Sequence, residues 1–145
     1  MRTPLTFFCA GLPKAQPRAK ARAFGGFAQV YNPKTADDWK IIVRHEALKA
    51  WIDYPNAWCG PLCVNLTFYF PRPKNHFRAN GLLKDTAPKW HTTKPDRDNL
   101  DKATLDALTN LGIWCDDKQV CDGTIRKLYA VSCGPGCGIQ IKEAE

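Results

Sequence analysis

The sequence has no apolar run long enough to cross a membrane, no internal repeat and no low-complexity tract. A membrane-spanning helix needs about 20 consecutive apolar residues, and the apolar stretch after Arg2 is also too short for the core of a signal peptide. Because 44% of the residues are hydrophobic, a wholly disordered chain is excluded as well. At 145 residues the chain is most simply a single domain, residues 1–145, and we expect it to be cytoplasmic.

Acidic residues are scarce relative to basic ones. The chain has 14 Asp and Glu against 21 Lys and Arg, which gives a formal net charge of +7 and a pI near 9.1. Such a surplus favours a polyanionic partner, with nucleic acid ahead of an acidic membrane surface.

Two long segments hold much of this positive charge, residues 13–34 with no acidic residue and residues 71–95 with only Asp85. We expect the first to be a basic loop or hairpin and the second a long functional or disordered loop. Their candidate nucleic-acid contacts are Lys14, Arg18, Lys20, Arg22, Arg72, Lys74, Arg78, Lys84, Lys89 and Lys94. Phe77 and Trp90 are candidates either for stacking on unpaired bases or for packing.

The cysteines do not suggest a disulfide framework, because there are seven of them and no secretion signal. Two pairs share the spacing C-x3-C, Cys59 with Cys63 and Cys133 with Cys137. Structural zinc sites usually show other spacings, so reduced thiols packed as small hydrophobic side chains are favoured over a zinc site.

The pattern of apolar residues predicts alternating strands and helices. A strand is expected at 4–11, a helix from an N-cap at Thr35 to Trp51, and a strand at 62–70. A second helix should run from Asp98 to about Gly112, followed by a strand at 119–132, a tight turn at 133–138 and a last strand at 139–143. This order predicts an α/β (α+β) fold in which a small mixed sheet packs with two main helices.

Negative charge is concentrated in one stretch, KPDRDNLDKATLDALTNLGIWCDDKQV, which holds six aspartates between residues 94 and 120. On a helical wheel, Asp98, Lys102 and Asp106 recur at i, i+4 and i+8 and form a polar row. Asp96 lies just before the helix, so its carboxylate can converge with that of Asp98. The opposite stripe, expected to pack on the sheet, consists of Leu100, Thr104, Ala107, Leu108 and Leu111.

Closely placed carboxylates repel one another unless they share a cation, and a hard divalent ion such as Mg²⁺ or Mn²⁺ suits oxygen ligands. The alternative is that Asp96 and Asp98 only stabilise the N-terminus of the helix, and for these two alone both interpretations are evenly balanced. Asp116 and Asp117 follow the helix, and a turn and strand can bring them beside the first pair. Taken together, the two acidic pairs favour a metal site.

The string DRDNLDKATLDAL…GIWCDDKQV resembles the signature of the RusA family of Holliday-junction resolvases, D-x-D-N-L-x-K, then D-A-L, then G and D-D-x-Q-V. All of these elements are present between residues 96 and 120. Outside this stretch the resemblance is looser: an N-terminal strand, a basic loop with Pro-Arg, and a Pro-x-Pro-Lys segment after the second strand. The resemblance implies a small mixed α/β fold, a homodimer, and Mg²⁺-dependent cutting of four-way DNA junctions.

Carried over by position, the resemblance implies catalytic and metal-binding roles for Asp96, Asp98 and Asp117, and makes Lys102 the essential lysine. Asp116 is a further candidate metal ligand, and Asp106 matches another acidic position of the motif. Mg²⁺, or Mn²⁺ in its place, would activate a water at the scissile phosphate. A homodimer would bring two active sites to two strands for paired symmetric incisions in DNA recombination and repair.

Two further interpretations stay open. One is a flap or branched-DNA endonuclease with the same chemistry, and the other is a non-catalytic DNA-binding module, stabilised by zinc in one version. The resemblance also implies a bacterial cell as the setting, with a phage or prophage as a source of the gene.

Overall fold

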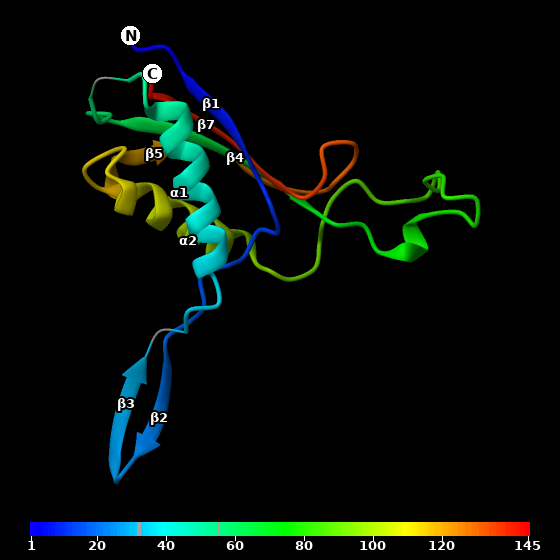
Figure 1. The fold of residues 1–145 in the computed structure, drawn as a ribbon, viewed down its shortest axis with the longest axis horizontal. Coiled ribbons are helices and arrows are strands. Elements are labelled where there is room, and N and C mark those ends of the chain that lie inside the picture. The colour runs from blue at the N-terminus through cyan, green and yellow to red at the C-terminus, as the bar shows by residue number, and fades with distance from the viewer. Residues whose placement is uncertain (32, 55) are drawn as a thin grey trace.

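The structure, a computed structural model, describes residues 1–31, 33–54 and 56–145; Asn32 and Pro55, which fall in the predicted connecting segments, lie outside the described residues. A five-stranded sheet forms the centre (Figure 1). Its strands are β1 (Leu5–Ala10), β4 (Leu62–Phe70), β5 (Val120–Asp122), β6 (Ile125–Tyr129) and β7 (Gly136–Glu143). The order is β1-β7-β4-β5, with β6 also paired to β4.

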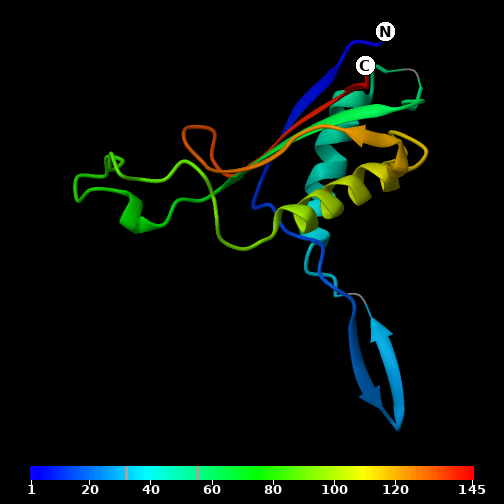
Figure 2. The same ribbon diagram turned by 180° about the vertical axis from the view of Figure 1, so that it is seen from behind.

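The sheet is mixed in direction. Strand β7 runs antiparallel to both β1 and β4, whereas β5 and β6 run parallel to β4. Helices α1 (Asp37–Trp51) and α2 (Arg97–Leu111) lie together over one face of this sheet (Figures 1 and 2). The predicted fold class, a small mixed sheet packed with two helices, is therefore confirmed.

Helix α1 buries Trp39, Val43 and Ala47, which recur at helical spacing and face the core between the helices and the sheet. The helix begins differently from the prediction. Ala36, not Thr35, is the N-cap residue, and no side chain caps the helix. Instead the backbone N–H of Asp37 donates to the carbonyl of Lys34 at 3.2 Å, so the turn is closed by the main chain.

Two segments extend from this body (Figures 1 and 2). The first is a hairpin of β2 (Lys20–Phe24) and β3 (Phe27–Tyr31), which pair only with each other in the sheet pattern. We call residues 18–31 the hairpin arm. The second is the predicted long loop, residues 71–95, which contains the short 3-10 helix η1 (Lys74–His76). Both basic segments are therefore outlying parts of the molecule.

The predicted strand at 119–132 is wrong as a single element. It is divided into β5 and β6, because at Gly123 the chain passes the backbone of Val64 so closely that a Cβ atom there would lie 1.9 Å from the Val64 carbonyl oxygen. A 3-10 helix, η2 (Asp117–Gln119), precedes β5. The last strand begins at Gly136, inside the predicted turn, because its first residues pair with β1 and β4.

The cysteines divide by burial. Cys9, Cys63 and Cys137 are buried, as expected for small hydrophobic side chains, whereas Cys59, Cys115, Cys121 and Cys133 are exposed. Along β7, Cys63 lies opposite Lys142 and Cys137 lies opposite Phe68. The two C-x3-C pairs thus belong to opposite ends of β4, and the zinc-stabilised interpretation gains no support.

Within the described part of the chain, no helix is both long enough and apolar enough to cross a bilayer.

Candidate active site

Helix α2 and the residue before it carry three of the four predicted catalytic residues. The helix begins at Arg97, one residue earlier than expected, and Asp96 is its N-cap residue, with an extended backbone (φ −72°, ψ 145°). The Asp96 carboxylate accepts no capping hydrogen bond. Asp96, Asp98 and Lys102 are all exposed, so their charged groups are accessible to a ligand.

The buried side of α2 fixes which way the polar row faces. The residues that it buries are Leu100, Ala103, Thr104, Ala107 and Leu108. The hydroxyl of Thr104 accepts a hydrogen bond from the indole N–H of Trp39 at 3.2 Å, so the polar atom inside this face is paired. Leu111, predicted to belong to this face, is only half-buried. With this side held in the core, Asp98 and Lys102 remain exposed.

The chain turns sharply after α2 and returns to the sheet. Gly112 ends the helix with a left-handed backbone (φ 85°), as predicted. Trp114 is buried, and its indole N–H donates to the hydroxyl of Thr109 at 2.8 Å. The same residue forms a parallel bridge with Trp58, just ahead of β4. Trp114 therefore ties the loop both to α2 and to the sheet.

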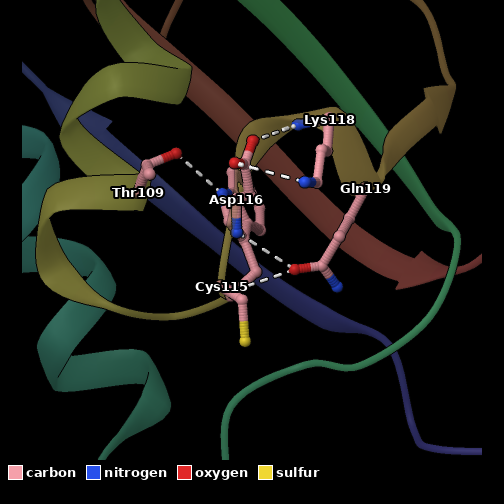
Figure 3. Close-up of polar contacts among 6 residues, drawn as sticks. Thr109, Cys115, Asp116, Lys118 and Gln119 are labelled. Carbon is pink, nitrogen blue, oxygen red and sulfur yellow. Dashed lines mark hydrogen bonds and ion pairs between the residues drawn. The ribbon is translucent and has the colours of Figure 1, made fainter.

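Gln119 holds the loop that carries the second acidic pair. Its side-chain oxygen accepts from the backbone N–H groups of Cys115 (2.8 Å) and Asp116 (3.1 Å), as Figure 3 shows. Its side-chain nitrogen donates to the carbonyls of Trp58 (3.2 Å) and Gly60 (3.0 Å). One amide side chain thereby joins the Asp116–Gln119 turn to the segment before β4.

The two aspartates of this pair have different surroundings. The Asp116 carboxylate accepts the backbone N–H of Lys118 at 2.9 Å and caps η2, and this hydrogen bond is the main reason that its pKa is lowered. Asp117 is exposed and begins η2. Asp116 thus stabilises the turn, while the Asp117 carboxylate is accessible.

Several carboxyl groups lie close enough to influence one another. Loss of some hydration raises the pKa of Asp117, and the neighbouring Asp116 and the charge of Asp106 raise it further, while Lys102 opposes the shift. Lys102 of α2 is therefore near enough for its charge to act on the Asp117 carboxyl of η2.

Asp101 belongs to the same group. Its pKa is raised first by burial and then by the charges of Asp117 and Asp98, against the opposing charge of Arg97. We call the following residues the acidic cluster: Asp98, Asp101, Lys102, Asp106 and Asp117.

Asp96, the N-cap residue of α2, acts on a basic side chain of the sheet. It raises the pKa of Lys127 in β6, although burial dominates and the pKa of that lysine is lowered overall. The Lys127 ammonium donates to the carbonyl of Thr93 at 2.7 Å. A cleft of about 470 Å³ opens here, lined among others by Arg18, Lys94 and Asp96.

Comparison with known proteins decides the family. The sequence profile described as "Endodeoxyribonuclease RusA" matches residues 10–142, nearly the whole chain. The chain belongs to this RusA endodeoxyribonuclease family. The family membership supports an endodeoxyribonuclease activity.

Two relatives illustrate the range of similarity within curated proteins. The chain is 32% identical to "Uncharacterized protein YqaN" of Bacillus subtilis (strain 168) over 143 residues, which cover 96% of both chains. It is 40% identical to "Crossover junction endodeoxyribonuclease RusA" of Escherichia coli (strain K12) over 60 residues, which cover 38% of this chain and 50% of that protein. The similarity to the E. coli protein is thus restricted to half of its length.

The donor chemistry of this RusA family member fits a hard divalent cation, since its acidic cluster offers accessible carboxylate oxygens. Within residues 1–31, 33–54 and 56–145, however, no three His, Cys, Asp or Glu side chains are grouped to hold a metal ion. Mg²⁺ commonly uses only one or two protein carboxylates, with water and substrate phosphate as the other ligands. The assignment of Asp96, Asp98 and Asp117 as ligands stays a prediction.

The basic residues predicted to contact DNA differ in whether their side chains already form an ion pair within the protein. On the hairpin arm the exposed basic side chains are Arg18, Lys20 and Arg22. In the 71–95 segment they include Lys74, Lys84, Lys89 and Lys94. Lys14 pairs with Asp38 and Arg78 pairs with Asp85, both at 3.0 Å. Exposed ion pairs of this kind contribute little and can be exchanged for phosphate.

Arg72 has a structural environment at the root of the 71–95 segment. Its guanidinium donates to the carbonyls of Ala130 (3.1 Å) and Pro88 (2.8 Å) and lies over the ring of Tyr129. Next to it the ring of His91 stacks on Phe70, with centroids 4.1 Å apart. These contacts fix where the segment leaves the sheet, so the Arg72 guanidinium already has partners within the protein and stabilises the fold.

Sequence reasoning missed several residues of the site. Asp101 follows Asp98 at i+3, a spacing that places the two side chains on the same side of a helix, so a signal for it was present. Gln119 stands inside the recognised motif, but its role depends on contacts with Trp58 and Gly60 that no local pattern shows. The nearness of Lys127 to Asp96 likewise arises only from the tertiary fold.

Proposed function

We propose that this protein is a Mg²⁺-dependent, structure-specific endodeoxyribonuclease that resolves four-way DNA junctions by paired symmetric incisions. The observation that supports the proposal is the acidic cluster, in which the charge of Lys102 acts on the Asp117 carboxyl although 15 positions separate the two residues in the sequence. Several carboxylates with one lysine, in a protein that also has a hairpin rich in basic residues, suit hydrolysis of a phosphodiester.

The chemistry divides between the residues of the site and the cation. Asp96, Asp98 and Asp117 would supply the carboxylate oxygens, and Mn²⁺ would substitute for Mg²⁺. When bound, the cation lowers the pKa of a coordinated water and offsets negative charge on phosphate oxygens. Hydrolysis forms a bond from the water oxygen to phosphorus and breaks the bond to the 3′ oxygen, which leaves with a proton. Lys102 would stabilise the charge that develops on the phosphate.

Charge complementarity supports the choice of DNA as substrate. Phosphodiester groups repel a bare carboxylate cluster, so approach requires both a cation in the site and positive charge around it. The hairpin arm and the 71–95 segment, which extend from the body in different directions (Figure 1), carry exposed Lys and Arg side chains. Such basic surfaces supply long-range attraction and contacts to backbone phosphates.

A homodimer is the assembly that paired incision requires. Two-fold symmetry would present one acidic cluster to each of two symmetric strands of a junction. The proposal of symmetric cutting therefore includes the proposal of a dimer, and cross-linking or sedimentation tests the second part separately.

The decisive experiment is a cleavage assay on a labelled four-way junction, with a flap substrate and a linear duplex as controls. Wild type is compared with Asp98→Asn and Asp117→Asn, in the presence and absence of Mg²⁺ and of Mn²⁺. We expect paired nicks that need the cation and fall by roughly 100-fold or more in both variants, since even groups that only orient a metal ligand contribute about 10–100-fold. Junction binding should persist in both variants.

The other outcomes distinguish the competing functions. Preferential cutting of flaps would agree with the proposed active site but would make a flap, and not the four-way junction, the preferred substrate. Binding without cutting in either metal would overturn the nuclease proposal and favour a non-catalytic DNA-binding module.

A further inference from the structure

The hairpin arm presents its described side chains to solvent. All described side chains from Arg18 to Tyr31 are exposed. A two-stranded hairpin is at best marginally stable in water by itself. The arm has five-residue strands, and none of its described side chains belongs to the hydrophobic core, so a bound partner would supply contacts that the arm lacks.

The two faces of the arm differ in chemistry. Side chains alternate along a strand and cross-strand partners share a face, so the register Lys20–Tyr31 and Arg22–Gln29 places these four residues on one face. The contacts agree, because Arg22 donates to the Gln29 side chain at 3.3 Å and lies over the Tyr31 ring at 5.1 Å. This face, which we call the cationic face, combines positive charge, an amide and an aromatic ring.

The opposite face is small and apolar. Its side chains are Ala21, Ala23, Ala28 and Val30, paired by the same register. Small side chains keep the ribbon thin, and this suits insertion between two strands of a nucleic acid.

An aromatic ring stands at the tip. Phe27 follows the two-residue turn Gly25-Gly26, whose φ values of 56° and 85° fit the tight hairpin turn that requires positive φ at both positions. Phe27 is 80% exposed, and it lies two residues before Gln29, on the cationic face. A fixed turn therefore holds an apolar ring at the far end of a basic ribbon.

The charge and the length of the arm favour DNA as its partner. Residues 13–34 contain five basic residues and no acidic one, so two copies of the arm would repel each other, whereas DNA would attract each. A five-residue strand is roughly 16 Å long, which exceeds the depth of the DNA major groove of about 8.5 Å. The tip can thus pass the backbone and reach bases.

The arm also begins beside the acidic cluster's helix. The backbone N–H of Gln16, two residues before the arm, donates to the carbonyl of Asn99 in the first turn of α2 at 2.9 Å. The root of the arm is therefore joined to the first turn of the helix that carries Asp98, so one DNA molecule could contact both the arm and the acidic cluster.

We propose that the hairpin arm is a branch-point probe: its cationic face holds phosphates, and Phe27 stacks on bases that are unpaired or unstacked where DNA strands exchange. Aromatic side chains stack on any base, so the contact selects DNA shape and not sequence. This inference rests on the proposed function, because it names the feature of the substrate that the site recognises.

The test uses a four-way junction with 2-aminopurine at the branch point, and a second junction with 2-aminopurine far out along one duplex. Full-length wild type, Phe27→Ala, Phe27→Trp and Val30→Ala are titrated without divalent metal, so that no cutting occurs. Val30 is the matched control, because it is 70% exposed on the opposite face. Cutting by each protein is then measured with Mg²⁺.

We expect wild type, Phe27→Trp and Val30→Ala to change the fluorescence at the branch point alone. Phe27→Ala should lose this change and bind the junction roughly 5- to 150-fold more weakly, the range for one base–aromatic stack, with linear duplex binding unchanged. Equal fluorescence and affinity for Phe27→Ala and wild type would overturn the inference, even in a protein that cuts junctions. So would a Phe27→Ala effect confined to the sedimentation of the free protein, since Phe27 would then contact another copy.

A Phe27-dependent fluorescence change in a protein that cuts no DNA would support the branch-point probe and overturn the nuclease proposal. The two proposals therefore fail separately.

Discussion

At the scale of single residues, one amide side chain determines where Asp117 lies. Gln119 makes four hydrogen bonds that join the Asp117 turn to the segment before β4. We predict that Gln119→Ala lowers the rate of cutting at saturating DNA by about 10–100-fold, the range for residues that orient a functional group, with junction Kd unchanged. Lys118→Ala is the control, because the lysine side chain is 82% exposed and its capping N–H is retained. Wild-type rates in Gln119→Ala would contradict this positioning role.

A second residue-scale prediction concerns two buried thiols. Cys9 and Cys137 lie opposite each other on β1 and β7, and burial raises the pKa of Cys9 from 9.0 to about 12 and also raises that of Cys137. Above pH 9 the unfolded chain loses these protons while the native state retains them, so the free energy of unfolding should fall as pH rises from 9 to 12. The slope from Cys9 alone is up to about 1.4 kcal/mol per pH unit.

Urea unfolding under reducing conditions across this pH range measures the effect. Cys9→Ala should give a shallower fall in the free energy of unfolding than wild type, whereas Cys133→Ala, which changes an exposed thiol, should match wild type. Identical slopes in all three proteins would show that Cys9 ionises as easily in the native state as in the unfolded chain.

At the scale of elements, the break between β5 and β6 depends on Gly123. Its φ of 137° and the 1.9 Å between a built Cβ and the Val64 carbonyl oxygen exclude any side chain. We predict that Gly123→Ala lowers the free energy of unfolding by about 1–3 kcal/mol or more. Gly138→Ala is a matched control within β7, since nothing lies within 4 Å of its built Cβ; an equal loss in both variants would contradict the steric argument.

The same elements show how far sequence reasoning reaches. Local patterns predicted the two main helices and the strand at 62–70, because apolar periodicity and helix-ending residues such as Gly112 act within a few residues. They did not predict the division at Gly123, since the backbone of Val64 that passes it comes from a distant strand. For the site, the motif indicated Asp98, Lys102 and Asp117, but not Gln119's contacts with Trp58. The exposure of Phe27 was likewise not readable from its neighbours.

At the scale of the whole molecule, charge is separated in space as well as in sequence. The acidic cluster lies on the body, whereas the hairpin arm and the 71–95 segment extend from it (Figures 1 and 2) and carry exposed basic side chains. The hairpin arm is anchored at its root by the Gln16–Asn99 hydrogen bond, and the 71–95 segment is anchored by the contacts of Arg72. The arms can therefore bind phosphates without disturbing the core that orients α2.

This separation predicts how junction binding responds to salt. Each phosphate contact releases counterions from DNA, so the logarithm of the binding constant falls with the logarithm of salt concentration by about 0.9 per contact. Replacing Arg18, Lys20 and Arg22 by Gln should reduce that slope by up to about 3 and leave thermal stability unchanged, because all three side chains are exposed. Lys49→Gln, on α1 and paired with Glu46, should keep the wild-type slope. A triple variant with an unaltered slope would place the phosphate contacts elsewhere, whereas a reduced slope together with retained cutting at low salt would assign the arm to binding and the acidic cluster to chemistry.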